Sequence, residues 1–284
     1  ITGTKRGRTK LTMTVNGQFY VTNLEVVGQG EIAVPQIVAG TNHMAVLKAD
    51  GTVWTWGLGT ALGNGNTGNS NTPVQVLKAV NTPLTNVVNI EAYGNMTFAV
   101  TESGEVYRWG NTAGTGHYNN GYVLCTNNTD TITYATKIDS LSNIVSVEIS
   151  QFVGYALSAS GELYGWGNRY HGAGNHVSSV PEAVLGGESG TSTLTGVISV
   201  KASQGATIAL KSNGTVFTWG NAGNNLTLSG VTYQEGLYSS SLGSTERNRY
   251  YSYTPVQVVQ GNAAAGKSAK FLEEVTDVEV NRVI

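Results

Sequence analysis

The sequence predicts an all-β protein built from stacked copies of one small sheet. Three observations carry this prediction: a high glycine content, a low charge, and a Trp-Gly pair that recurs at nearly constant spacing. Glycine accounts for 37 of the 284 residues, about twice its usual share. Charged residues make up 12%, about half of the usual fraction. Long helices need charged helix formers and avoid glycine, so a helical bundle or coiled coil is excluded.

The Trp-Gly pairs define four copies of a repeat, at spacings of 53, 57 and 53 residues. The pairs are Trp56 and Gly57, Trp109 and Gly110, Trp166 and Gly167, and Trp219 and Gly220. Four blocks end on these glycines and align without gaps, at residues 34–57, 87–110, 144–167 and 197–220. A fifth copy begins near Val275 and extends into its first strand at Ile284.

Each block predicts three strands in order. In the second copy Val88, Ile90 and Ala92 alternate with polar residues, so they share one face of the first strand. The second strand is apolar, and a turn pair such as Asp50-Gly51 then predicts a tight hairpin to the third strand. The third strand ends on the Trp-Gly pair, and its glycine releases the chain into a loop.

The third strand also places two aromatic residues on one face, because residues two apart in a strand point the same way. Trp54 and Trp56 form this pair in the first copy. Their regular recurrence favours packing between neighbouring sheets over a row of sugar-binding side chains. One such sheet cannot bury its own apolar face, so the copies must stack, and a stack of twisted sheets hides its edges by closing into a ring. We therefore expect a β-propeller of four-stranded blades.

Several motif parts carry a family resemblance. The segments 72–76 (Thr-Pro-Val-Gln-Val), 103–110 (Ser-Gly-Glu-Val-Tyr-Arg-Trp-Gly) and 254–258 (again Thr-Pro-Val-Gln-Val) resemble the repeat of the regulator of chromosome condensation family. The resemblance covers residues 30–284 and implies a seven-bladed propeller, of which about four and a half repeats are present.

Residues 1–29 do not fit the repeat. Their Ile-Thr-Gly start and the Thr-Lys-Leu-Thr-Met-Thr-Val run at 9–15 are similar to the last strands of a bacterial immunoglobulin-like domain. The alternative is that they belong to an incomplete first blade. We expect two regions, 1–29 and 30–284, with flanking domains of a longer chain available for assembly.

The charge balance gives no reason to expect nucleic acid as a partner, with 16 basic and 18 acidic residues. No apolar run approaches the length of a membrane span. The single Cys125 excludes a disulfide framework within the chain. A lone cysteine is typical of a reducing compartment or of a bacterial exterior protein that does not use disulfides.

No motif predicts catalysis, a cofactor or a metal site. His171 and His176 share one glycine-rich loop, but no acidic residue or cysteine stands beside them, so an ordinary loop is favoured. Cys125 has no partner that would mark it as a nucleophile. A catalytic site made by these histidines with Arg108 and Arg169 stays open as an alternative.

The loops after the Trp-Gly pairs vary in length and composition while the blocks do not, as expected of a rigid scaffold that presents binding loops. Tyrosine with Ser, Gly, Asn and occasional Arg is typical of recognition surfaces. The residues predicted to bind a ligand are Tyr118, Tyr122, Arg169, Tyr170, Arg249, Tyr250 and Tyr251.

These observations favour a non-enzymatic recognition or adhesion module that binds a protein or a glycan. The low charge and the immunoglobulin-like segment place it, as an expectation, on a bacterial surface or outside the cell. The alternatives are a structural subunit or spacer, a secreted enzyme inhibitor, and the small-GTPase exchange factor that the family resemblance implies.

Overall fold

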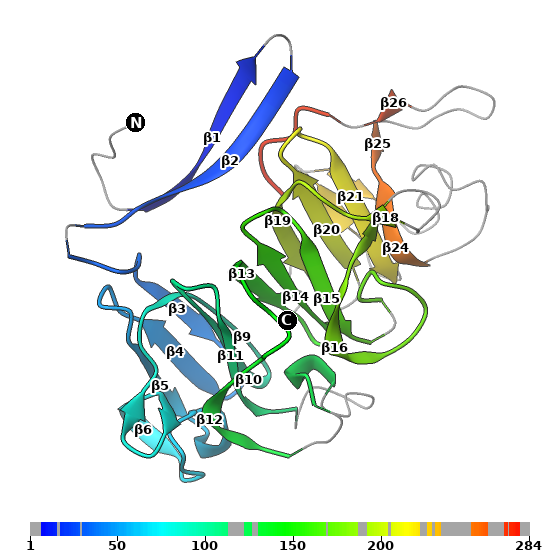
Figure 1. Cartoon of the computed structure of the whole chain (residues 1–284). Coiled ribbons are helices and arrows are strands. Elements are labelled where there is room, and N and C mark those ends of the chain that lie inside the picture. Colours follow the sequence, from blue (N-terminus) through cyan, green and yellow to red (C-terminus); the bar gives the residue numbers. More distant parts are fainter. Residues whose placement is uncertain are drawn as a thin grey trace.

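The computed structural model consists of four antiparallel sheets of four strands, which we call blades 1 to 4 (Figure 1). The residues that it describes are 7–15, 18–28, 30–112, 122–126, 130–168, 170–186, 192–203, 206–221, 226–228, 231–233, 251–260, 270–271 and 273–278. Among them no helix is long and apolar enough to cross a membrane. The predicted all-β propeller architecture is confirmed.

Each blade follows the order of the chain, so every strand pairs with the strand before it. Blade 1 contains β3 (Gln36–Ala39), β4 (His43–Leu47), β5 (Val53–Gly57) and β6 (Ser70–Gln75). Blade 2 contains β9 (Val87–Tyr93), β10 (Asn95–Thr101), β11 (Val106–Asn111) and β12 (Ile132–Lys137). Blade 3 contains β13 (Ile144–Ile149), β14 (Val153–Ser158), β15 (Leu163–Gly167) and β16 (Ser178–Ala183). Blade 4 contains β19 (Val197–Ala202), β20 (Ala206–Lys211), β21 (Val216–Asn221) and β24 (Tyr251–Gln257).

Smaller elements connect the blades. Two short 3₁₀ turns follow the third strands of blades 1 and 2, namely η1 (Gly59–Ala61) and η2 (Tyr122–Leu124). Four minor strand pairs are β7 (Leu77–Ala79) with β8 (Thr82–Pro83), β17 (Leu185–Gly186) with β18 (Ser192–Thr193), β22 (Leu226–Leu228) with β23 (Val231–Tyr233), and β25 (Val259–Gln260) with β26 (Lys270–Phe271).

One backbone hydrogen bond recurs at each boundary between consecutive blades. The first residue of each new repeat donates its backbone N–H to the turn glycine of the preceding blade. The bonds are Val87 to Gly51, Ile144 to Gly104, Val197 to Gly161 and Val275 to Gly214, all between 3.0 and 3.1 Å. The last of these places Val275 where a fifth blade would begin, as the repeat spacing predicts, although residues 273–278 form no assigned strand.

The hydrophobic core lies between blades, not within them. One cluster joins Ala45 and Leu47 of blade 1 to Ile90 and Trp109 of blade 2. Equivalent clusters lie between blades 2 and 3 and between blades 3 and 4. Small residues in the second strands let neighbouring sheets approach closely. The fold is therefore stabilised by the contacts that only stacking provides.

The repeated tryptophans pack as predicted, against the loop that follows the Trp-Gly pair of the preceding blade. Trp166 donates its indole N–H to the Val123 carbonyl of η2 at 2.7 Å. Trp109 and Trp219 are also buried, whereas Trp56 in blade 1 is only half-buried. The glycine after each tryptophan has a positive φ, between 104° and 116°, a conformation that favours glycine.

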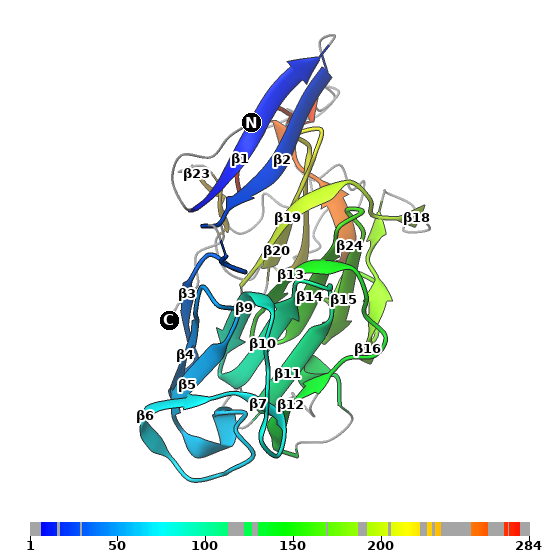
Figure 2. The ribbon, with the colours of Figure 1, turned by 60° about the vertical axis from the view of Figure 1, so that its left-hand side comes forward.

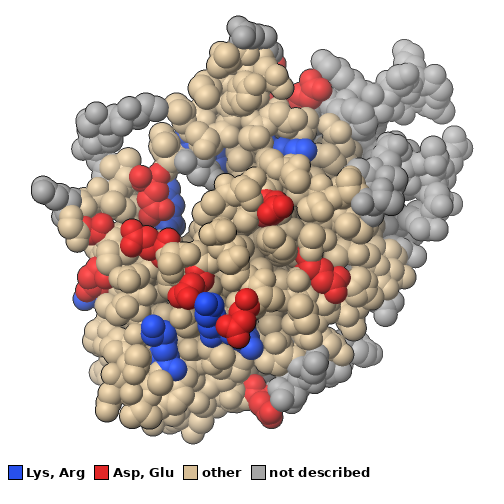
Figure 3. Space-filling model, in the orientation of Figure 1, with Lys and Arg blue, Asp and Glu red and all other residues tan. Residues whose placement is uncertain are grey.

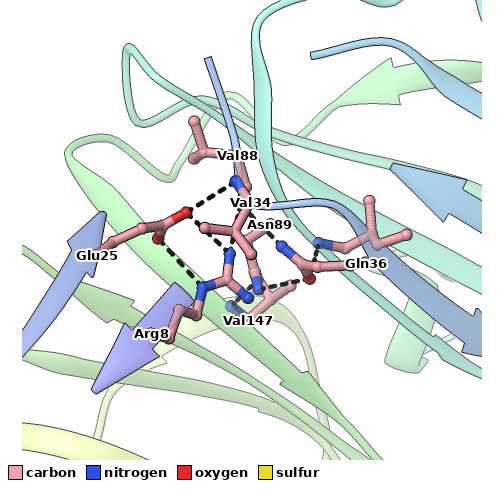
Figure 4. A network of polar contacts seen from close by, with 8 residues as sticks. Arg8, Glu25, Val34, Gln36, Val88, Asn89 and Val147 are labelled. Atoms are coloured by element: carbon pink, nitrogen blue, oxygen red, sulfur yellow. Dashed lines mark hydrogen bonds and ion pairs between the residues drawn. The ribbon is translucent and has the colours of Figure 1, made fainter. Parts of the chain in front are cut away.

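A ladder of side-chain acceptors joins the inner strands of blades 1 to 3 (Figure 4). The amide oxygen of Gln36 on β3 accepts the backbone N–H of Ile90 on β9 at 3.3 Å. One blade further on, the amide oxygen of Asn89 accepts the backbone N–H of Val147 on β13 at 3.2 Å. Gln36 and Asn89 occupy equivalent repeat positions, so the same bond is made twice. Polar side chains thereby join the first strands of neighbouring blades.

Residues 7–26 form a separate hairpin of β1 (Gly7–Val15) and β2 (Gln18–Val26). These strands pair only with each other among the described residues. The hairpin lies at one end of the blades (Figures 1 and 2). Val21 donates its N–H to the Ser212 carbonyl of blade 4 at 2.7 Å, and Arg8 donates to the Val88 carbonyl of blade 2 at 2.9 Å. Its assignment to an immunoglobulin-like domain stays a prediction.

Candidate functional site

The structure describes three of the predicted ligand-binding residues. Tyr122 begins η2 and is half-buried, and Tyr170 lies in the loop between β15 and β16. Tyr251 begins β24, and nothing further is described of its side chain. The remaining predicted residues lie outside the described part of the chain, and they are Tyr118, Arg169, Arg249 and Tyr250.

The structure brings Tyr170 together with Tyr253, which is distant in sequence. The two rings are stacked, with centroids 5.3 Å apart and planes inclined by 8°. Tyr170 comes from the loop of blade 3 and Tyr253 from the outer strand of blade 4, so the stack spans the boundary between two blades. Both side chains are half-buried. The stack is therefore a contact between the loop of blade 3 and the outer strand of blade 4.

A buried tyrosine beneath this stack fixes the loop of Tyr170. The Tyr155 hydroxyl donates to the Tyr170 carbonyl at 3.1 Å and accepts the Trp219 indole N–H at 2.9 Å. It also lies 3.0 Å from the Thr207 hydroxyl. Since a phenol has one proton to donate, Thr207 must be the donor in that pair. Burial raises the pKa of Tyr155, so the phenol stays protonated and the network holds the loop to blade 4.

The same loop carries His171 and His176, for which the sequence favoured an ordinary loop over a metal site. The Nε2 atom of His176 lies 2.7 Å from the carboxylate of Glu182, and Nε2 of His171 lies 3.6 Å from the same oxygen. The two imidazole rings meet edge to face at 4.9 Å. Sequence spacing does not identify Glu182, because this residue stands on β16 and only the pairing of β15 with β16 brings it to the histidines.

His171 is fully buried and held firmly. Its Nδ1 atom lies 2.8 Å from the Asn168 carbonyl oxygen, which also accepts the His171 backbone N–H. Burial lowers the pKa of His171, so the neutral imidazole is the favoured form. Gly172, at φ 93°, then lets the chain pass over Trp219, where a Cβ atom would come within 3.1 Å of the indole nitrogen. The loop is thus fixed by backbone bonds and close packing despite its glycines.

The other residues considered for catalysis have structural surroundings. The Arg108 guanidinium donates to the backbone carbonyls of Leu124, Thr136 and Lys137, which tie its own blade together. Burial raises the pKa of the Cys125 thiol to about 12, which opposes its use as a nucleophile. Arg169 lies outside the described residues.

The charged groups of the described surface are sparse and of mixed sign on the face seen in Figure 3. Several are paired, such as Lys137 with Glu105 at 2.7 Å and Lys201 with Glu148 at 3.0 Å. This face therefore offers no broad patch of one charge, and recognition there depends on shape, aromatic contact and hydrogen bonds.

The blades and their loops define a β-propeller repeat protein in which loops of different length follow the third strands of stacked blades. Residues 35–61 and 50–100 match two models of the regulator of chromosome condensation (RCC1) repeat. The chain therefore carries RCC1 repeats, as the motif resemblance indicated.

Known proteins match this chain in sequence over most of its length. Protein pim1 of Schizosaccharomyces pombe is 28% identical over 202 residues, which are 66% of this chain and 37% of pim1. The mitochondrial RCC1 domain-containing protein RUG3 of Arabidopsis thaliana is 29% identical over 213 residues, covering 72% of this chain and 46% of RUG3. The chain thus spans less than half of the length of these two relatives.

Solved structures show the same fold. The crystal structure of human WBSCR16 superposes with a TM-score of 0.57 at 18% identity, covering 84% of this chain and 56% of WBSCR16. Yeast RCC1 (Prp20), bound to Kap60, gives 0.54 at 17% identity, with 84% and 51% covered. Prp20p of Saccharomyces cerevisiae, described with its binding properties to Gsp1p and histones, gives 0.52 at 17% identity, with 86% and 60% covered.

The predicted bacterial extracellular location is wrong. The relatives are eukaryotic proteins, and one of them is named as mitochondrial. The Gly and Asn content that suggested an exterior protein has a structural origin. Each repeat needs glycine or asparagine at its tight turns and at the positive-φ positions that start a blade.

Proposed function

We propose that this chain is a non-enzymatic protein-recognition module. It binds a protein partner through the face of the propeller on which the third strands end. The stack of Tyr170 on Tyr253 is the observation that carries this proposal. It joins two blades, and the buried Tyr155 hydroxyl fixes its geometry from below. A partner would therefore meet an aromatic anchor that loses little conformational freedom on binding.

The relatives support a protein partner over a glycan. Yeast RCC1 was solved bound to the protein Kap60, and Prp20p was described with its binding to Gsp1p and histones. A propeller fold alone does not decide function, so the proposal depends on the site. The mixed, sparse charge of the surface seen in Figure 3 fits a neutral protein surface better than a strongly basic or acidic one.

Selection of a displayed random-peptide library on the purified chain tests this proposal, since peptides collect at surfaces that favour binding. We expect the selected peptides to bind the wild type and to lose affinity for the Tyr170→Ala/Tyr253→Ala double variant. Purified Gsp1p and core histones are assayed beside the peptides, and a glycan array in parallel. Binding on the glycan array without any binding of peptide or protein would contradict the proposal.

A further inference from the structure

Three side chains with metal-binding atoms converge at the outer edge of blade 3. His171 and His176 come from the loop 168–177, and Glu182 comes from β16, which pairs with β15 on the other side of that loop. One donor atom from each residue lies within 4.8 Å of the donor atoms of the other two. Imidazole nitrogen and carboxylate oxygen are ligands that zinc accepts readily.

The hydrogen bonds of His171 determine which of its nitrogens is free. The Asn168 carbonyl can only accept, so Nδ1 of His171 carries a proton and donates it over 2.8 Å. In the neutral ring Nε2 then bears a lone pair. That atom is buried, has no hydrogen-bond partner, and points at the Glu182 carboxylate 3.6 Å away. Two electron-rich atoms therefore face each other across a gap with no proton assigned to it.

The Asn168 bond is also the support that a metal-binding histidine usually has. A ligating imidazole commonly donates its second nitrogen to a carbonyl or carboxylate, which fixes the tautomer and the ring plane. Here the same carbonyl accepts the backbone N–H of His171 at 3.1 Å, so the ring cannot easily rotate away. His171 is oriented as a ligand before any ion arrives.

Two of the three donor separations lie near those of a small tetrahedral ion, and all three donor atoms lie within 4.8 Å of one another. Zinc binds nitrogen and oxygen at about 2.0–2.2 Å, which places neighbouring donors about 3.3 Å apart. His171 and Glu182 lie close to this separation, at 3.6 Å, while His176 and Glu182 lie closer, at 2.7 Å. His176 is 48% exposed and Glu182 38% exposed, so His176 is free to withdraw by the small amount required. Their exposure also leaves the ion an entry path and a fourth position for water.

We propose that His171, His176 and Glu182 form a zinc-binding site that fastens the loop 168–177 to β16. An ion held there cross-links the two ends of the loop that carries Tyr170. The site does not depend on the recognition function proposed above, since zinc binding is measured without any protein partner.

The test is a calorimetric titration in which zinc chloride is added to the chelator-treated chain. We expect one zinc per chain for the wild type. His176→Ala and Glu182→Gln each change a partly exposed side chain, so both variants should fold, and each is expected to weaken zinc binding at least tenfold. Glu162→Gln, on an exposed acid of the same blade, is the matched control and should bind as the wild type does.

Cobalt(II) gives an independent readout, because a tetrahedral cobalt site absorbs visible light far more strongly than an octahedral one. We expect this absorption with the wild type and with Glu162→Gln, and its loss in His176→Ala and Glu182→Gln. Zinc should also raise the melting temperature of the wild type and not of these two variants. Equal zinc affinity in the wild type and in both variants, or less than one ion per chain, would overturn the proposal.

Discussion

The indole N–H of Trp219 donates to the hydroxyl of Tyr155 over 2.9 Å, and the two rings meet edge to face with centroids 5.6 Å apart. This contact joins blade 3 to blade 4 beneath the loop that carries Tyr170. Trp219, which recurs in every copy of the repeat, thus provides the apolar contact between the blades. Tyr155, at a position that differs between copies, provides the polar contact.

Replacing Tyr155 by phenylalanine should destabilise the fold by about 1–3 kcal/mol, because the Trp219 N–H and the Thr207 hydroxyl lose a buried partner. Urea unfolding measures this difference. Tyr20→Phe is the control, since Tyr20 lies on the N-terminal hairpin and is 38% exposed. An effect of equal size in both variants would contradict the role assigned to Tyr155.

Substitutions at equivalent tryptophans should have unequal effects. Trp109→Ala removes a fully buried side chain between blades 1 and 2 and should cost about 3–5 kcal/mol. Trp56→Ala removes a half-buried one and should cost about half as much. Thermal and urea unfolding of the two variants compare them directly. Equal losses would show that Trp56 is as fully packed as Trp109.

Acidification should lower the free energy of unfolding, because His43 is buried in its neutral form. This residue is buried at 3% exposure, its Nε2 lies 2.6 Å from the Thr97 hydroxyl of blade 2, and burial lowers its pKa to about 4. In the unfolded chain the pKa is 6.5, so between pH 6.5 and 4 the unfolded state binds more protons. The stability that neutral His43 provides is complete above pH 6.5 and is lost as the pH falls through 4.

The expected loss over this interval is up to about 3 kcal/mol. His43→Met is the comparison, because the chain itself places Met96 at this repeat position in blade 2. The free energy of unfolding of this variant should depend less on pH between 7 and 4 than that of the wild type. Parallel pH profiles for the two proteins would show that His43 does not contribute.

Asn89→Ala should weaken the ladder of the inner strands. The Val147 N–H loses its acceptor, which should cost about 1 kcal/mol and speed hydrogen exchange at Val147. Ser199→Ala changes the equivalent position of blade 4 and should shift the stability by less than about 0.5 kcal/mol. If the exchange rate of Val147 were unchanged in Asn89→Ala, the ladder would not hold these strands.

Periodicity predicted those features that depend on a single repeat. The expected shared face of Val88 and Ile90 is wrong, because the register of β9 with β10 shifts at Val88: Ile90 lies in the cluster between blades 1 and 2, whereas Val88 contacts the cluster between blades 2 and 3. The Trp-Gly pairs correctly located the third strands and the packing between blades. These features are predictable because the same local pattern occurs four times and cannot bury its apolar face alone.

Features that depend on contacts between loops and strands could not be predicted. Glu182 reaches His171 only through the register of β15 with β16, in which Gly165 lies opposite Glu182. Tyr253 reaches Tyr170 only because blade 4 stacks on blade 3. Neither distance can be inferred from the spacing of these residues in the sequence. The amino-acid composition also led to the wrong prediction of an extracellular location. The turn-forming residues that the propeller requires give a composition similar to that of exterior proteins.

The recognition surface is the central claim, and the affinity of a selected peptide for single variants tests it most directly. Fluorescence anisotropy with the labelled peptide provides this affinity. We predict that Tyr170→Ala and Tyr253→Ala each weaken binding at least tenfold, as expected for aromatic anchors, while Tyr20→Ala changes it less than about twofold. Undiminished binding by both anchor variants, with their folds intact by circular dichroism, would contradict the claim that this stack is the recognition surface.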